Sequence, residues 1–263
     1  CDAYGAGFFY IPGSDTCLKI GGYVRAEYRI YSHDRYWGGA YGWSNRDEHG
    51  ISTRARADIQ IDARTNTEMG LLRSFIEVEL NTNSAGNGTT NSGSPITTLD
   101  KAFIQFGGLT AGRATSFFDF WTGETYGSYF EPAHSDTNIN LLGYTFAFGN
   151  GITASVAIED PSSGSAGRRH ASPFIDGNYA GVKAPDFVAN VNISQAWGSA
   201  QVMAALHQDY ASVASALYDG DKWGFAVGGG VKVNLPMLGA GDQIALQAVY
   251  SKGAIDYASP DWG

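Results

Sequence analysis

Charged side chains are the residues of this chain whose types and spacing could do chemistry. They lie in one irregular stretch and in three stretches where charged or polar residues alternate with apolar ones. The irregular stretch, residues 113–137, has neither the period of two of a strand nor the 3.6-residue period of a helix. It is rich in carboxylates and aromatic residues, a composition that suits a long loop folded back against other parts of the protein. We therefore expect an ordered functional loop whose chemistry is electrostatic. Its carboxylates are Asp119, Glu124, Glu131 and Asp136.

Three stretches nearer the N-terminus place charged or polar residues at every second position. Residues 18–30, 54–64 and 72–80 each alternate in this way, so each predicts a strand with one apolar and one charged face. The basic residues of the charged faces are Lys19, Arg25, Arg29, Arg54, Arg56, Arg64 and Arg73. The acidic ones are Glu27, Asp58, Asp62, Glu77 and Glu79.

Bond-making chemistry and metal binding find little support in the sequence. Asp219–Asp221 is too short for a calcium-binding loop and is interpreted as a polar turn. A dinucleotide-binding loop is followed by a helix, and no helix is predicted after Gly5–Gly7, so this segment is not interpreted as such a loop. No set of Ser, His and Asp residues has the spacing of a known catalytic triad, and spacing alone does not decide the point because triads assemble in space. With no other catalytic or ligand-binding motif in the sequence, we expect no enzyme, no cofactor and no metal site. The histidines lack metal-type spacing and are interpreted as surface loop residues: His33, His49, His134, His170 and His207.

Composition and charge exclude two further classes of protein. The 35 glycines, 15 tyrosines, 14 phenylalanines and 6 tryptophans favour strands and tight turns, and no convincing amphipathic helix is present. A net charge of -9 excludes a nucleic-acid partner, because no basic stripe could neutralise phosphates. No apolar run approaches the roughly 18 residues of a transmembrane helix, which excludes a helical membrane protein.

The elements that must position the charged residues are long alternating strands. Alternating runs of about 10 residues or more match transmembrane β-barrel strands, whereas strands of soluble sandwiches usually last about 5 or 6. Later runs at 142–148 and 152–158 continue the pattern, and Gly149–Gly151 joins them as a tight hairpin. Glycines in the run at 222–234 suggest close contacts or strong curvature. A half-buried sheet of a soluble sandwich remains the alternative.

The connections between the predicted strands alternate strictly between long and short. Long external loops and short periplasmic turns produce this rhythm in bacterial outer-membrane barrels. The count gives eleven strands, and an odd number leaves a sheet edge open. We therefore expect a chain truncated at its C-terminus. The short turns are at 66–69, 107–108, 149–151 and 198–199, and the long loops include 31–51, 81–97 and 113–137.

Cys1 and Cys17 are the two cysteines of the chain. A disulfide between them would close a loop and stabilise the folded protein by about 3 kcal/mol, and it would persist in an oxidising compartment. Two unrelated thiols are the alternative. The chain starts without Met and without a signal peptide, so we expect a processed, exported protein.

Three stretches of the sequence resemble the alphaproteobacterial general-diffusion porins of the brucellar and rhizobial kind. They are CDAYGAGFFYIPGSDTCLKIGGYVRAEY, LDKAFIQFGGLTAGRATSF and PDFVANVNISQAWGSAQVMAALH. The resemblance covers essentially the whole chain and implies a single all-β domain over residues 1–263, a transmembrane antiparallel β-barrel. In that family the barrel has sixteen strands, forms a homotrimer in the bacterial outer membrane, and folds its third external loop inward. The family's closing strand is absent from this sequence.

By this resemblance, residues 113–137 are the third loop and narrow the channel. The four loop carboxylates would face basic residues of the wall, and such opposed charges order water and filter solutes. Some pairs would also act as plain ion pairs that pin the loop. The wall residues assigned in this way are Arg25, Arg29, Arg54, Arg56, Arg64, Arg73 and Arg113, although the alternation does not define the face of Arg113.

The function that follows is passive diffusion of ions and small hydrophilic solutes through a water-filled channel. The carboxylates of the loop and of the first three strands outnumber the basic residues there, which predicts a weak cation preference. The expected partners are outer-membrane lipid and two further copies of the chain. A soluble or surface β-protein that acts as a binding or adhesion module is the alternative, and solubility without detergent would distinguish the two.

Overall fold

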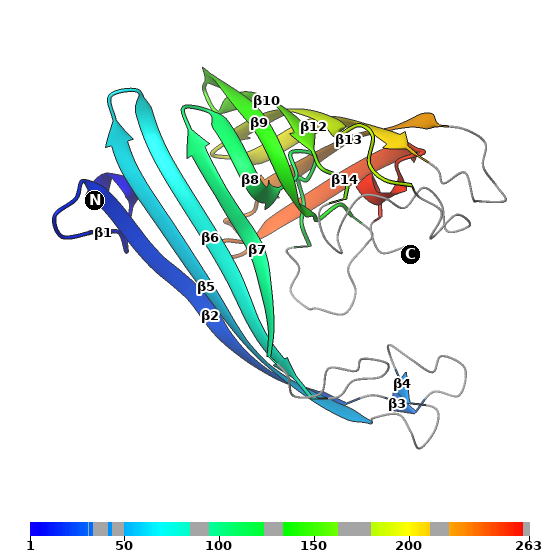
Figure 1. Ribbon diagram of the computed structural model, residues 1–263, viewed down its shortest axis with the longest axis horizontal. Helices are drawn as coiled ribbons and strands as arrows, with labels where there is room; N and C mark the ends of the chain where they lie inside the picture. The colour runs from blue at the N-terminus through cyan, green and yellow to red at the C-terminus, as the bar shows by residue number, and fades with distance from the viewer. Residues whose placement is uncertain are drawn as a thin grey trace. The chain divides into compact units, whose positions relative to one another are not determined.

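The computed structural model describes residues 1–30, 32–33, 42–43, 50–84, 95–123, 134–162, 180–210 and 221–259. Twelve strands form one sheet in the order β1-β2-β5-β6-β7-β8-β9-β10-β11-β12-β13-β14, so each strand neighbours the next long strand along the chain (Figure 1). The chain divides into two compact units, Cys1–Ala102 and Phe103–Gly263. The antiparallel β-sheet predicted from the sequence is confirmed.

The first unit is built on long paired strands. The strands β2 (Thr16–Ile30), β5 (Ile51–Thr67) and β6 (Gly70–Asn83) contain 15, 17 and 14 residues and pair antiparallel along their length. Short elements flank them: η1 (Asp2–Tyr4), β1 (Phe9–Tyr10), and the parallel pair β3 (Ser32–His33) and β4 (Gly42–Trp43). The strand β7 (Pro95–Phe106) begins in this unit.

A disulfide fastens the start of the first unit. Cys1 and Cys17 are joined, with their Cα atoms 5.5 Å apart, as predicted. Since Cys17 is buried at the start of β2, the bond ties η1 to the sheet.

The second unit contains the remaining strands. They are β8 (Leu109–Thr115), β9 (Asn138–Gly149), β10 (Ile152–Glu159), β11 (Asp186–Gln195), β12 (Gly198–Asp209), β13 (Lys222–Asn234) and β14 (Gln243–Lys252), followed by η2 (Ile255–Tyr257). The predicted Gly149–Gly151 hairpin joins β9 to β10, and Asn150 has the positive φ of 50° that such a turn requires.

The two faces of the strands differ sharply, and the apolar face is the exposed one. Val24, Ile30 and Val202 are 83%, 77% and 68% exposed. On the opposite face Asp58 and Asp62 are only 5% and 8% exposed. A soluble sandwich would bury its apolar face, so this inverted distribution argues against the soluble alternative. The alternation predicted for the strands is therefore confirmed, with the apolar residues on the outside.

Five details differ from the sequence predictions. His33, interpreted as a loop residue, lies in the short strand β3 because Ser32–His33 pairs with β4. The sheet contains a twelfth strand, the two-residue β1, besides the eleven predicted long strands. The turn before β12 consists of residues 196 and 197, because Gly198 already pairs with β13. Arg113 belongs to β8, so the loop starts at Ser116. His207 is not a surface loop residue: it lies in β12 and is 3% exposed, because a carboxylate partner lets the imidazole be buried.

Candidate functional site

The charged face of β2, β5 and β6 brings the predicted basic and acidic residues of the first unit together. The antiparallel register places inward positions of three strands in rows across the sheet. Each of the six predicted arginines of this unit has a side chain on this face and contacts a partner there. They are Arg25, Arg29, Arg54, Arg56, Arg64 and Arg73.

At one end of this face, three arginines share one carboxylate. Glu27 pairs with Arg25 at 2.8 Å, with Arg29 at 2.7 Å and with Arg54 at 2.5 Å. The side chains of Arg25 and Arg29 remain 45% and 41% exposed. Among the described residues, one carboxylate therefore holds three guanidinium groups together.

Towards the other end, Asp62 is held by two arginines. Arg64 lies 2.8 Å and Arg73 3.0 Å from Asp62 Oδ2, and each also donates through its Nε to Asp62 Oδ1. Such forked contacts are the strong form of an arginine-carboxylate pair. Between the two clusters, Arg56 pairs with Glu79 and donates to Asn81.

The first part of the loop, residues 116–123, packs on the wall of the second unit. Phe118 is fully buried within a cluster of wall residues, and its ring meets Tyr257 edge-on with 4.8 Å between centroids. Phe117 and Phe120 lie over Gly143 and Gly230, where a Cβ atom would come within 2.6 Å and 2.5 Å of their rings. The second of these contacts is the close approach that the glycines of β13 predicted.

Polar wall side chains bind the backbone of the same segment. Asn190 donates to the carbonyl of residue 117 at 2.5 Å, and Gln201 donates to the carbonyls of residues 118 and 119 at 3.3 Å. Gln247 accepts from the amide of residue 121 at 3.0 Å. The fully buried Glu159 accepts from Ser116 Oγ at 2.8 Å and from the next amide at 2.9 Å. The start of the loop is therefore bound to the polar face of the sheet over most of its length.

Asp119 holds the two ends of the loop together. Its carboxylate accepts hydrogen bonds from Ser135 Oγ and, at 2.7 Å, from the amide of Thr137. Ser135 and Thr137 are 0% and 2% exposed, so these bonds satisfy buried donors. The rings of Trp121 and His134 also meet, with their centroids 4.6 Å apart and their planes tilted by 60°.

The remaining predicted site residues are placed less completely. Arg113 is half-buried in β8, opposite Asn140, and Asp136 is exposed next to the loop end. Glu124 and Glu131 lie outside the described residues. The predicted facing of loop carboxylates and wall arginines across a channel stays a prediction.

Sequence reasoning missed a buried polar network in the second unit. Asp186 is fully buried; it binds His207 Nδ1 at 2.7 Å and accepts from the Tyr257 hydroxyl at 2.8 Å. The same tyrosine packs on Phe118, so this network supports the start of the loop. The three residues are far apart in the sequence and have no motif spacing, and no local signal could have found them.

The described residues contain no group of three or more His, Cys, Asp or Glu side chains arranged to hold a metal ion. Within the same part of the chain, neither helical segment has the length and apolar character needed to cross a membrane.

Comparison with known proteins identifies relatives over the whole chain. Residues 1–263 match the family model described as the Porin subfamily. Porin Omp2b of Brucella suis biovar 1 is 32% identical over 278 residues, which cover 100% of this chain and 67% of that protein. Porin Omp2b of Brucella melitensis biotype 1 is 31% identical over the same shares. The chain thus spans about two thirds of the length of these relatives, which are channel proteins rather than enzymes.

The fold is similar to that of an outer-membrane channel. The crystal structure of the channel DcaP of Acinetobacter baumannii matches with a TM-score of 0.69 and 18% identity. The match covers 95% of this chain and 68% of DcaP. At this identity the similarity concerns the fold alone, and it identifies the sheet as one of the outer-membrane barrel type.

Proposed function

Because this chain belongs to the porin subfamily, we propose that it conducts ions and small hydrophilic solutes passively across the bacterial outer membrane, with a weak preference for cations. The diffusion channel and its location follow from the family. The cation preference, the role of the loop and the assembly as a homotrimer are the proposed parts.

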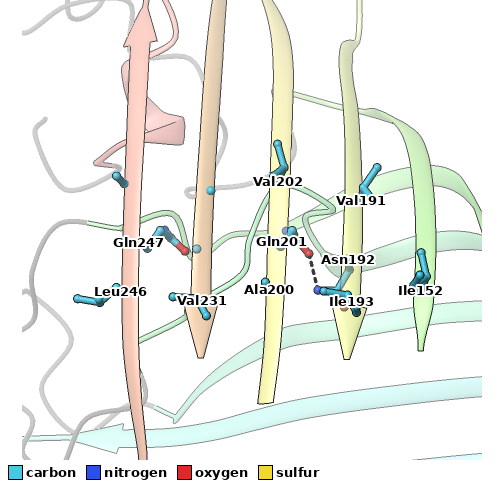
Figure 2. Close-up of a pocket in the computed structure, with 13 residues that line it drawn as sticks. Ile152, Val191, Asn192, Ile193, Ala200, Gln201, Val202, Val231, Leu246 and Gln247 are labelled. Carbon is cyan, nitrogen blue, oxygen red and sulfur yellow. Dashed lines mark hydrogen bonds between the residues drawn. The ribbon is translucent and has the colours of Figure 1, made fainter. Parts of the chain in front are cut away.

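The inverted distribution of side chains is the observation that carries this function. Lipid-facing strands of outer-membrane barrels alternate apolar outward and polar inward. The apolar face here includes shallow grooves such as the one in Figure 2, about 690 Å³ in volume, lined by Ile152, Val202, Val231, Leu246 and their neighbours. We assign this face to outer-membrane lipid. The polar face, which binds Phe118 and its neighbours through Asn190 and Gln201, is then the channel side.

We propose that residues 113–137 narrow the channel. The attachment of residues 116–121 to the polar wall supports this role, because a segment fastened there takes up space on the channel side. The loop carboxylates would then act on passing ions, opposed by the arginines of the wall, and an electrostatic filter of this kind needs no bond-making group.

The proposed cation preference is weak because most charges of a wide, water-filled channel are screened beyond about 8 Å at physiological salt. The excess of carboxylates over basic residues on the first three strands and the loop sets its sign.

Reconstitution in planar lipid bilayers tests the function. The full-length protein should produce uniform, ohmic channels, whereas residues 1–263 alone should give erratic channels or none, because the predicted sheet leaves an edge open. In the full-length protein a KCl gradient should give a small reversal potential of cation-selective sign. Chemical crosslinking of the detergent-extracted protein should give a trimer as its largest species. An anion-selective reversal potential would contradict the proposed preference while leaving the channel itself intact. A protein that is soluble without detergent and forms no channels would contradict the function as a whole.

A further inference from the structure

Asp58, in the middle of β5, is a buried carboxylate without a cationic partner. It is 5% exposed, and none of the described basic residues forms an ion pair with it. Its Oδ1 atom is buried and has no hydrogen-bond partner. A buried carboxylate oxygen of this kind is costly, and in native structures it usually marks a bound ion or water.

Asp62, on the same strand and the same face, shows what a paired carboxylate looks like in this wall. It is 8% exposed, close to the value for Asp58, and it is held by Arg64 and Arg73. Asp58 instead lies opposite Tyr23 on β2 and Glu79 on β6. The arrangement of the strands therefore places two arginines in contact with Asp62 and none of the described arginines in contact with Asp58.

The neighbours of Asp58 add negative charge. Glu77 and Gln60 lie beside it, and Glu79 is directly opposite. The basic residues nearby are already engaged: Lys101 lies 2.8 Å from Glu77, and Arg56 pairs with Glu79. Among the described residues, Asp58, Glu77 and Glu79 thus share two cations, and Lys101 also lies 3.6 Å from Asp100, so the charge of Asp58 has no cationic partner of its own.

We propose that Asp58, with Glu77, forms a binding site for a partly hydrated alkali cation such as K⁺. Hard cations prefer carboxylate and carbonyl oxygens, and the orphaned Oδ1 atom supplies a ligand that no protein group uses. The described residues offer no three-carboxylate or histidine cage, which fits a monovalent ion that keeps water ligands rather than a tightly held divalent metal.

This inference rests on the proposed cation preference and adds a structural cause for it, because a site on the wall would bind cations on their way through the channel and would not bind anions. Binding to one site with partial hydration favours entry and still permits exit, as conduction requires. The site lies wholly within the first unit, on β5 and β6.

The experiment measures thermal unfolding of the detergent-solubilised protein at constant ionic strength, with KCl replaced stepwise by N-methylglucamine chloride. The bulky organic cation cannot reach a buried oxygen. In the wild type, K⁺ should lower the unfolding equilibrium constant by the factor 1 + [K⁺]/Kd, about twofold when the concentration equals Kd, and the melting temperature should rise with it. Asp58→Asn, which keeps the shape of the side chain, should abolish this dependence.

Asp62→Asn is the matched control, since it removes the same charge from the same face of the same strand. It should lower stability overall and retain the dependence on K⁺. Glu77→Gln provides a second variant should Asp58→Asn not fold, and it should weaken the dependence. No difference between K⁺ and the organic cation in the wild type would mean that only water or nothing occupies the site, and would overturn the proposal. An unchanged K⁺ dependence in Asp58→Asn, or its loss in Asp62→Asn, would also overturn it.

Two further measurements test the cation site separately from the proposed function. A K⁺ dependence that is absent at pH 7 would overturn the cation assignment. Glu79, Arg56, Lys101 and Tyr23 are the other charged or titratable groups that face the site. Reversal potentials measured on the same preparations report the proposed function separately. A cation-selective channel without K⁺-dependent stability refutes the site and leaves the preference standing.

Discussion

Asp119 and Asp136 belong to the same loop and carry the same charge, yet their substitution by alanine should have different consequences. Asp119 accepts hydrogen bonds from two buried donors, the Ser135 hydroxyl and the Thr137 amide, whereas Asp136 is exposed. Both substitutions remove one carboxylate from the proposed constriction. Only Asp119→Ala also releases the bond between the two ends of the loop.

The structure sets the expected magnitude. A buried donor left without a partner costs about 1–3 kcal/mol. Asp119→Ala leaves two such donors, and rotation of the serine hydroxyl relieves part of the cost, so we expect a loss of about 2–4 kcal/mol. Asp136→Ala should cost less than about 1 kcal/mol, because exposed carboxylates contribute little.

Two measurements test this pair. Denaturant unfolding in detergent micelles, followed by tryptophan fluorescence, gives the stability of each variant. Planar bilayers give the reversal potential and the open-channel noise. Both variants should shift the reversal potential towards anions by similar amounts, and only Asp119→Ala should unfold more easily and conduct with more noise.

Two results would refute the reasoning. Equal stability of the two variants would show that the contacts of Asp119 do not hold the loop ends together. Unchanged reversal potentials in both would show that residues 113–137 do not line the ion path, and the proposed constriction would then have to be assigned to another segment.

Three further predictions concern the wall, the apolar face and the disulfide. Replacing Arg54 and Arg56 by glutamine should move the reversal potential towards cations in a salt gradient, and an unchanged value would remove them from the ion path. Val202→Lys, a charge on the exposed apolar face, should cost about 2–4 kcal/mol of unfolding free energy in lipid vesicles if it lies near the bilayer midplane; a neutral effect would contradict lipid contact there. Replacing Cys1 and Cys17 by serine should cost about 3 kcal/mol in denaturant unfolding and leave conductance unchanged, whereas altered conductance would give the disulfide a role in the channel.

The first residues of the loop are firmly supported by the wall of the second unit. They are held by apolar packing around Phe118 and by side-chain hydrogen bonds from β10, β11, β12 and β14. Behind that packing, the Asp186, His207 and Tyr257 network buries a charge-bearing group deep in the wall. These contacts hold residues 116–121 in place, and the proposed role of the loop charges in selectivity rests on this attachment.

Alternation along the chain was sufficient to predict the strands and their faces. Successive side chains of a strand point to opposite sides, so the pattern from Leu18 to Ile30 defines one apolar and one charged face before any partner strand is known. The same holds for the hairpin at Gly149–Gly151, because its backbone conformation depends on local residues. The resemblance predicted an inward course for the loop, which stays a prediction, and the contacts of residues 116–121 show where the start of the loop is attached.

Only the tertiary structure decided which charges are paired. Asp58 and Asp62 look alike in the sequence, four residues apart on the same predicted face. The register of β5 with β6, and the reach of neighbouring side chains, place Asp62 next to Arg64 and Arg73 and place Asp58 opposite Glu79. Likewise, His207 was interpreted as a loop residue, but the structure places it beside Asp186 of β11, which also accepts a hydrogen bond from Tyr257 of η2. Electrostatic partners lie across strands and loops, at distances that the local pattern of a sequence does not contain, so pairing and burial of charge are set by the fold.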